Sequence, residues 1–291
     1  MRLLVTGASG WIGRHLVPLL QHDGHQVVGL ARSAESAARM TAAGVEPLPG
    51  DLTDTSLLRD AAERTDGVVH LAYQHDFDHF AEAGTLDATA VAAFATALTG
   101  TGKPLVIASG TPAVPGRLAT EADWVTEGPT GARGRVARTV VDLADRDVRG
   151  VVVRLPRSVH GPGDQGFVTW LARIAQQAGL SGYPGDGSAR WPAVHVDDAA
   201  QVFRFAVAAA APGTVLHAVG DQGIPVREIA AALADRLGLP SGTRSAQEIG
   251  FLGLMMTADQ PASGAATDAL IGRRPAGAGL LADIAAGYYD L

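Results

Sequence analysis

A strand, a glycine-rich turn and a helix open the chain, and this stretch constrains the fold more than any other. Residues 1–5 form a short apolar run of strand composition, and residues 14–20 have the apolar spacing of a helix. Between them, residues 6–13 read Thr-Gly-Ala-Ser-Gly-Trp-Ile-Gly. These glycines allow a tight turn and a close approach of backbone to ligand, and the helix start offers unpaired N–H groups to an anion. The stretch therefore predicts a pyrophosphate site of a dinucleotide, in preference to a purely structural turn.

The end of the second predicted strand bears on the choice of dinucleotide. Residues 27–31 predict this strand and residues 34–43 a helix, which together begin a doubly wound parallel sheet. An Asp or Glu at the strand end suits the ribose of NAD, whereas an Arg suits the 2′-phosphate of NADP. Arg32 and Ser33 stand there. We therefore expect NADP(H) in preference to NAD, the alternative being that Arg32 is only a solvated loop residue.

Titratable side chains follow the predicted strand of residues 67–73. Tyr73 ends this strand and His75 lies just beyond it, where ligands bind in parallel sheets. An imidazole has an ordinary pKa of about 6.5, so His75 suits proton transfer at neutral pH. His70, inside the apolar run, is predicted to be a core histidine. The His and Asp residues that follow offer no third firm metal ligand, so no metal site is expected.

The rest of the chain predicts two domains. Strands are expected at residues 103–108 and 150–155, separated by a basic helix at 130–147, and the alternation stops being regular from Pro156. The fold class is α/β, a Rossmann-type doubly wound parallel sheet with a smaller C-terminal α/β substrate domain. The predicted boundaries are 1–160 for the NADP(H)-binding domain and 161–291 for the substrate-binding region, with some later segments returning to the main sheet.

The amino-acid composition limits the kinds of molecule that the protein is expected to bind. The 291 residues include 23 basic and 30 acidic side chains, a net charge of −7, which argues against a nucleic-acid or anionic membrane surface. No apolar run approaches the ~20 residues of a membrane span, and Met1 leads directly into the first strand, so a cytoplasmic protein is expected. The absence of cysteine excludes disulfides and thiol catalysis.

Several motifs together resemble one known group of enzymes. They are the glycine-rich opening, Gly-Asp-Leu at 50–52, His-Leu-Ala at 70–72, Arg-Leu-Pro at 154–156 with His-Gly-Pro-Gly at 160–163, and Trp-Pro-Ala-Val-His-Val-Asp-Asp at 191–198. The chain is similar to extended or atypical short-chain dehydrogenase/reductases, the NAD(P)-dependent epimerase/dehydratase superfamily. The resemblance covers nearly the whole chain.

The resemblance implies roles for particular residues. Contacts to the dinucleotide are implied for Gly7, Ser9, Gly10, Trp11, Ile12, Gly13, Arg32, Ser33, Asp51, Leu52, Leu71, Ala72, Tyr73, Ser109, Pro156 and Ser158. Thr111 matches the position of a catalytic Ser or Thr. Such enzymes also commonly form dimers, so a homodimer is expected, as is a small-molecule substrate.

The departure from this family concerns the active site. These reductases use a Tyr as proton donor and, four residues later, a Lys, yet residues 112–150 contain neither. Alignment places the motif near residues 129–133, where Arg133 is expected to take over the ribose contact. The candidate acids are then Tyr73, His75 and Tyr183, unless the substrate needs none. Arg190 is expected either to meet a substrate group or to pair with Asp186 or Asp197.

Three functional hypotheses follow. The first is an NADP(H)-dependent oxidoreductase that transfers hydride to a small or medium organic carbonyl, imine or activated alkene. The second is an epimerase, dehydratase or cyclase that keeps NADP as a transient redox agent or scaffold. The third is a non-catalytic NADP(H) sensor, which the missing Tyr and Lys make credible.

Overall fold

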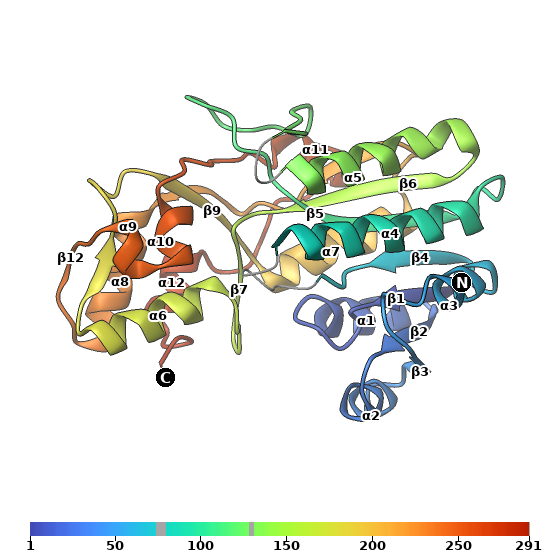
Figure 1. The fold of residues 1–291 in the computed structure, drawn as a ribbon, viewed down its shortest axis with the longest axis horizontal. Helices are drawn as coiled ribbons and strands as arrows, with labels where there is room; N and C mark the ends of the chain where they lie inside the picture. Colours follow the sequence, from blue (N-terminus) through green and yellow to red (C-terminus); the bar gives the residue numbers. More distant parts are fainter. Residues whose placement is uncertain (74–79, 128–130, 291) are drawn as a thin grey trace. The chain divides into compact units, whose positions relative to one another are not determined.

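A computed structural model describes residues 1–73, 80–127 and 131–290 of the chain. These residues form two compact units, each built from three segments (Figure 1). The first unit comprises Met1–Ser109, Trp124–Arg154 and Ala200–Leu216, and the second comprises Gly110–Asp123, Leu155–Ala199 and His217–Leu291. Ala200–Leu216 thus belongs to the first unit and His217–Leu291 to the second, although both segments follow residue 160. The predicted domain boundary at residue 160 stays a prediction.

A seven-stranded sheet organises the first unit, in the order β10-β6-β5-β4-β1-β2-β3. Its strands are β1 (Arg2–Thr6), β2 (Gln26–Ala31), β3 (Glu46–Pro49), β4 (Gly67–His70), β5 (Pro104–Gly110), β6 (Arg149–Leu155) and β10 (Thr214–His217). The pairs β1–β2, β1–β4, β2–β3 and β4–β5 are parallel. The strand order reverses between β1 and β4, which confirms the predicted Rossmann-type sheet and marks the place where such sheets bind ligands.

Helices cover both faces of this sheet. They are α1 (Gly13–His22), α2 (Ala34–Ala42), α3 (Thr55–Glu63), α4 (Phe80–Leu98), α5 (Gly131–Asp142) with the 3₁₀ turn η1 (Leu143–Arg146), and α7 (Val196–Ala208). Leu58, Phe94 and Val140 bring α3, α4 and α5 into one apolar cluster with the sheet. On the other face, Arg204 of α7 forms an ion pair with Asp23, directly after α1.

The second unit contains two smaller sheets. Strands β7 (Ser158–His160), β9 (Arg190–His195) and β11 (Asp221–Pro225) form one, in the order β11-β9-β7, and β8 (Ser181–Tyr183) pairs with β12 (Ser241–Thr243) in the other. Its helices are α6 (Phe167–Ala178), α8 (Val226–Leu237), α9 (Ala246–Ile249), α10 (Phe251–Met256), α11 (Ala265–Ile271) and α12 (Leu280–Ala285). Trp191, Ile229, Leu280 and Tyr289 lie in its core.

Two strands of the second unit are very short. Residues 158–160 form β7, which pairs in parallel with β9, and β8 ends at Tyr183, before a Pro-Gly turn. Both strands have only three residues. Segments this short lack a readable alternation of apolar residues, so neighbouring glycine and proline dominate the pattern.

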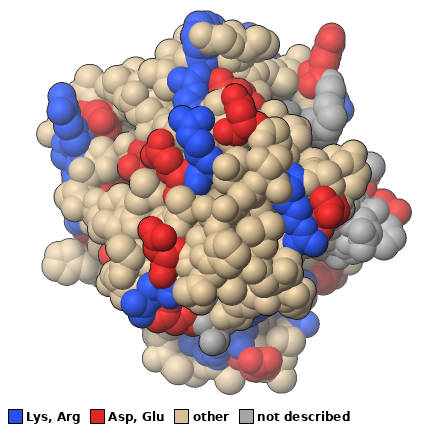
Figure 2. All heavy atoms as spheres, turned by 90° about the vertical axis from the view of Figure 1, so that its left-hand side faces the viewer, with Lys and Arg blue, Asp and Glu red and all other residues tan. Residues whose placement is uncertain are grey.

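The surface drawn in Figure 2 carries Lys and Arg side chains intermixed with Asp and Glu. Such mixing avoids a single-sign field on that face. None of the described helices has both the length and the apolar character needed to cross a membrane.

Candidate functional site

The glycine-rich turn lies directly against the end of β4. Gly7 has a φ of +72°, and a methyl group added there would lie 2.9 Å from the backbone nitrogen of Ala72. At Gly13 an added methyl would lie 2.1 Å from the carbonyl oxygen of Gly7. Both positions therefore require glycine, one for backbone conformation and one for the packing of α1 against the turn. This packing holds the start of α1 at the carboxyl edge of the sheet.

The start of α1 suits an anion. Its N-cap residue, Ile12, makes no side-chain hydrogen bond to the first turn, and the first turn carries no acidic residue. The peptide N–H groups and the helix dipole therefore present positive potential that no side chain of the helix neutralises. The residues present fit the pyrophosphate of a dinucleotide.

Arg32 and Ser33 follow β2, as the sequence predicted, and both are exposed. The Ser33 hydroxyl oxygen accepts the backbone N–H of Ser36 at 3.1 Å and caps α2. Among the described residues, Arg32 has no hydrogen-bond or ion-pair partner, so its guanidinium is available to a phosphate. The Ser33 hydroxyl therefore has a structural role as a helix cap. Its contact with a phosphate stays a prediction.

Asp51 and Leu52 lie after β3. The Asp51 carboxylate accepts the N–H of Thr53 at 3.0 Å, and Leu52 packs at the edge of the core of the first unit. Asp54 accepts the N–H of Leu57 at 3.0 Å and caps α3. These bonds fix the turn that would face an adenine ring, and the adenine contact itself stays a prediction.

A buried hydrogen-bond chain supports the segment after β4. The N–H of Ala72 donates to the Thr6 hydroxyl at 3.2 Å, and this hydroxyl lies 2.7 Å from Nδ1 of His70. Nε2 of His70 lies 3.2 Å from the carboxylate of Asp87 on α4. All three hydrogen bonds of this chain form when Nε2 of His70 carries the ring proton and the Thr6 hydroxyl donates to Nδ1 of His70. His70 is therefore a core histidine, as predicted, and its chain fixes the backbone next to Gly7.

Tyr73 and Arg133 form the most distinctive contact of the first unit. The Arg133 guanidinium carbon lies 4.1 Å from the centre of the Tyr73 ring. Nη2 of Arg133 donates to the carbonyl of Ala108 at 2.9 Å, while the buried Nε has no partner among the described residues. The Ser109 hydroxyl lies 3.5 Å from the carbonyl of Arg133. The structure thus joins three predicted site residues, Tyr73, Ser109 and Arg133, although they come from three different elements.

The environment of Tyr73 keeps its phenol protonated at neutral pH. Burial raises the pKa of Tyr73, and the carboxylate of Asp87 adds to this effect, while the positive charge of Arg133 acts in the opposite direction. Burial prevails, so the pKa lies above the ordinary value of 10. A protonated phenol beside a cation can donate a proton and leave a phenolate that the cation stabilises.

Four further predicted site residues lie in the second unit. Thr111 and Ser158 are buried, and neither hydroxyl has a hydrogen-bond partner among the described residues. Pro156, which lies between them in the sequence, is also buried, and Tyr183 of β8 is half-buried. Their predicted roles stay predictions, and His75 lies outside the described residues.

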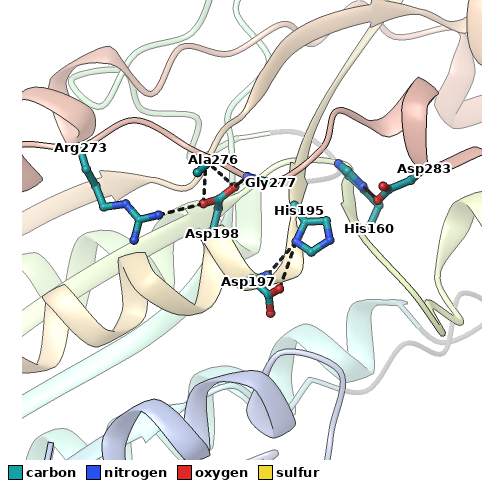
Figure 3. Close-up of polar contacts among 8 residues, drawn as sticks. All are labelled: His160, His195, Asp197, Asp198, Arg273, Ala276, Gly277 and Asp283. Atoms are coloured by element: carbon teal, nitrogen blue, oxygen red, sulfur yellow. Dashed lines mark hydrogen bonds and ion pairs between the residues drawn. The ribbon is translucent and has the colours of Figure 1, made fainter. Parts of the chain in front are cut away.

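The second unit holds a separate cluster of histidines and carboxylates (Figure 3). Nδ1 of the fully buried His160 lies 2.6 Å from the carboxylate of Asp283 on α12. Burial lowers the pKa of His160 more than Asp283 raises it, so the neutral ring donates from Nδ1. The ring of His195 lies 5.7 Å away, centre to centre.

The carboxylate of Asp198 in this cluster holds the chain before α12. It accepts N–H groups from Ala276 and Gly277, at 3.0 and 2.7 Å, and pairs with Arg273 at 3.6 Å. The Trp-to-Asp motif thus has a structural role in joining remote segments of the second unit (Figure 3).

The pairing expected for Arg190 is wrong. Its guanidinium binds Asp259 through two bonds, of 3.0 and 2.8 Å, and not Asp186 or Asp197. Sequence reasoning also missed Asp87, Asp283 and the buried Gln260. An acidic residue inside the alanine-rich α4 was only a weak signal for Asp87. Asp283 and Gln260 are remote in sequence from their partners.

Comparison with known proteins identifies the family. The model of the NAD dependent epimerase/dehydratase family matches residues 3–218. The chain belongs to this family, which lies within the extended short-chain dehydrogenase/reductases and contains NAD(P)-dependent oxidoreductases, epimerases and dehydratases. It is an enzyme of this NAD(P)-dependent kind.

Individual relatives extend over most of the chain. An uncharacterised protein of Schizosaccharomyces pombe is 40% identical and covers 99% of this chain and 100% of its own. The 2-alkyl-3-oxoalkanoate reductase of Stenotrophomonas maltophilia is 30% identical over 82% of this chain and 77% of its own. The solved structure of MoeE5 in complex with UDP-glucuronic acid and NAD has a TM-score of 0.79, is 23% identical, and covers 99% of this chain and 98% of its own. This last likeness concerns the fold.

Proposed function

We propose that the protein is an NADP(H)-dependent reductase that transfers hydride to the carbonyl, imine or activated alkene of a small organic molecule. The contact between Tyr73 and Arg133 carries this proposal, because it offers a proton donor beside a cation in a chain that lacks the usual Tyr and Lys. The name of the Stenotrophomonas relative, a reductase of an oxoalkanoate, supports carbonyl reduction.

The cofactor would be held by the first unit. The start of α1 would bind the pyrophosphate, the loop after β3 would meet the adenine, and residues 71–73 would meet the ribose and nicotinamide. Arg32 would bind a 2′-phosphate, which is why NADP(H) is proposed over NAD. Bound NADPH would supply the hydride.

The chain's own residues then supply the proton and its control. The Tyr73 phenol would donate its proton to the atom that gains negative charge, and Arg133 would stabilise the resulting phenolate from the ring face. The chain from Asp87 through His70 and Thr6 would hold the backbone at Ala72, and so the position of Tyr73.

The cofactor test compares NADPH and NADH in fluorescence titrations. Arg32→Ala should weaken NADPH binding ten- to a hundredfold, because charge-assisted bonds of about 1.5–3 kcal/mol are lost, and should leave NADH unchanged. Arg39→Ala is the matched control, since Arg39 is an exposed cation of the following helix, paired with Glu35 at 2.5 Å. An equal loss of NADPH and NADH binding in Arg32→Ala would reject the NADP assignment.

The reaction test follows NADPH oxidation with ketones, imines and enones, beginning with a 3-oxoalkanoate. Tyr73→Phe should lower kcat by about 10²–10⁴ while the variant still binds NADPH. Activity should stay level up to about pH 10, since a donor acts while protonated and the pKa of Tyr73 is raised. A limb near pH 6.5 that disappears in His75→Asn would assign the proton to that imidazole instead.

A second candidate function is epimerisation or dehydration through a transiently oxidised substrate, and the family model favours it. In that reaction oxidised NADP would take hydride from the substrate and then return it, so the cofactor would undergo no net change. Product formation from a nucleotide sugar, without net oxidation of the cofactor, would identify this function. Nucleotide binding with no turnover in either assay would indicate a sensor.

A further inference from the structure

Arg157, directly before β7 in the second unit, is a cation with no counter-charge among the residues that the structure describes. Its Nε–H donates to Oε1 of Gln260, and its guanidinium carbon lies 5.7 Å from the centre of the Trp191 ring. Among residues 1–73, 80–127 and 131–290, no carboxylate pairs with it. Burial lowers the pKa of Arg157 to about 10, so the surroundings have removed water without supplying an anion.

Neighbouring acceptors are already engaged. Gln260 uses its side-chain nitrogen to bind the carbonyl of Thr111 and its backbone N–H to bind Arg190, so the amide is fixed in orientation. Asp259, adjacent to Gln260 in sequence, accepts two guanidinium bonds from Arg190. The carboxylate next to Gln260 is therefore committed to Arg190, and among the described residues the four N–H groups at the Nη atoms of Arg157 have no protein acceptor.

Arg149 of the first unit is a structural cation whose hydrogen bonds can be compared with those of Arg157. It is also partly buried, but its two Nη atoms donate to the carbonyls of Ala206, Val207 and Ala210, at 2.6–3.0 Å. The chain thus satisfies one guanidinium with three carbonyls, whereas within the described part of the chain the Nη atoms of the other have no acceptor.

Other polar atoms around Arg157 are also left without partners. The hydroxyl of Thr111, whose carbonyl binds Gln260, is buried and unpaired among the described residues. So are the hydroxyl of Ser158, the next residue in the chain, and Nε1 of Trp191, whose ring lies beside the guanidinium. Each is a hydrogen-bond donor, and buried donors in native proteins are normally satisfied. The cluster is therefore rich in donors and poor in acceptors.

We propose that Arg157, with the donors around it, binds the carboxylate of a small organic acid. The paired Nη atoms match the two oxygens of a carboxylate. A single guanidinium neutralises one negative charge, so a phosphate dianion would leave excess charge in a half-buried site. The carboxylate would belong to the substrate, and in this respect the inference rests on the proposed reductase.

The test measures binding without nucleotide, so its outcome is independent of reductase activity. Benzoate, acetoacetate and inorganic phosphate are titrated separately by calorimetry at constant ionic strength. We expect the wild type to bind one equivalent of a carboxylate, Arg157→Gln to bind it at least tenfold more weakly, and Arg157→Lys to recover only part of the affinity. Arg173→Gln is the matched control, because Arg173 is an exposed cation of α6 in the same unit, and it should bind as the wild type does.

Stability distinguishes a ligand site from a structural contact. If Arg157 serves a ligand, carboxylate should raise the unfolding temperature of the wild type and leave that of Arg157→Met unchanged. The proposal is overturned by the absence of carboxylate binding, by phosphate binding as tightly as carboxylate, by unchanged affinity in Arg157→Gln, or by an equal rise in the unfolding temperature of Arg157→Met when carboxylate is added. If carboxylates bind but NADPH is never oxidised, the site stands and the proposed reductase fails.

Discussion

Adding one methyl group at Gly13 should abolish dinucleotide binding. In Gly13→Ala the new carbon would lie 2.1 Å from the carbonyl oxygen of Gly7 and 2.6 Å from that of Ala8, whereas ordinary contact begins at 3.4 Å. The start of α1 must therefore move by about 1 Å, and overpacking of this kind costs about 1–3 kcal/mol of stability. Such a shift stretches N–H···O bonds of about 2.9 Å beyond the range in which they are strong.

The main effect of Gly13→Ala should be on the binding of NADPH and not on the stability of the fold. We expect the Kd of Gly13→Ala for NADPH to rise at least a hundredfold, about 2.7 kcal/mol, in a fluorescence titration of folded protein. Gly24→Ala is the control, since Gly24 has a φ of +81° with open space where a methyl would be added. Gly24→Ala should lose about 1–2 kcal/mol of stability through backbone strain, which is similar to the loss expected for Gly13→Ala, and it should still bind NADPH normally. Wild-type affinity in Gly13→Ala, or an equal loss in Gly24→Ala, would refute the reasoning.

Substitutions at three other residues probe the two units by urea unfolding. Arg133→Met should lose about 2–3 kcal/mol, because it removes both a cation–π contact and a charged hydrogen bond, and Arg133→Lys should lose less. Asp87→Ala should lose about 1–3 kcal/mol by leaving Nε2–H of the buried His70 unpaired. The bond from Arg117 lowers the pKa of Asp123, so its contribution is complete above the ordinary carboxyl pKa and is lost as the pH falls below it. Asp123→Asn should therefore be less stable than wild type at pH 7, with a difference that shrinks toward pH 2.

The sequence predicted those parts of the site that depend on neighbouring residues. Gly7 is required for backbone conformation and Gly13 for packing, both within one strand-turn-helix unit, so their spacing indicates them without any remote contact. His70 was correctly predicted as a core histidine because its apolar neighbours indicate burial. Its partner Asp87 is 17 residues away, on a helix whose rotation about its own axis decides what it contacts.

Contacts between remote segments could not be predicted in this way. His160 and Asp283 are 123 residues apart, and Arg157 and Gln260 are 103 apart. Their contacts exist because β7 and β9 pair and the C-terminal segments pack beside them. No local pattern encodes that packing, and the lack of a counter-charge at Arg157 within the described ranges follows only from the positions of remote carboxylates such as Asp259.

The replacement of Lys by Arg beside a tyrosine changes more than the identity of the cation. A lysine ammonium is a compact charge that can hydrogen-bond to a phenolate oxygen, whereas the planar guanidinium of Arg133 lies over the face of the Tyr73 ring and donates to a backbone carbonyl. Its charge therefore opposes the effect of burial on the pKa of Tyr73 without overcoming it. The proposed donor is consequently a weak acid, best matched to a substrate whose reduction creates a strongly basic atom. The dinucleotide site leaves this chemistry undetermined, since the same glycine-rich turn would serve either acid strength.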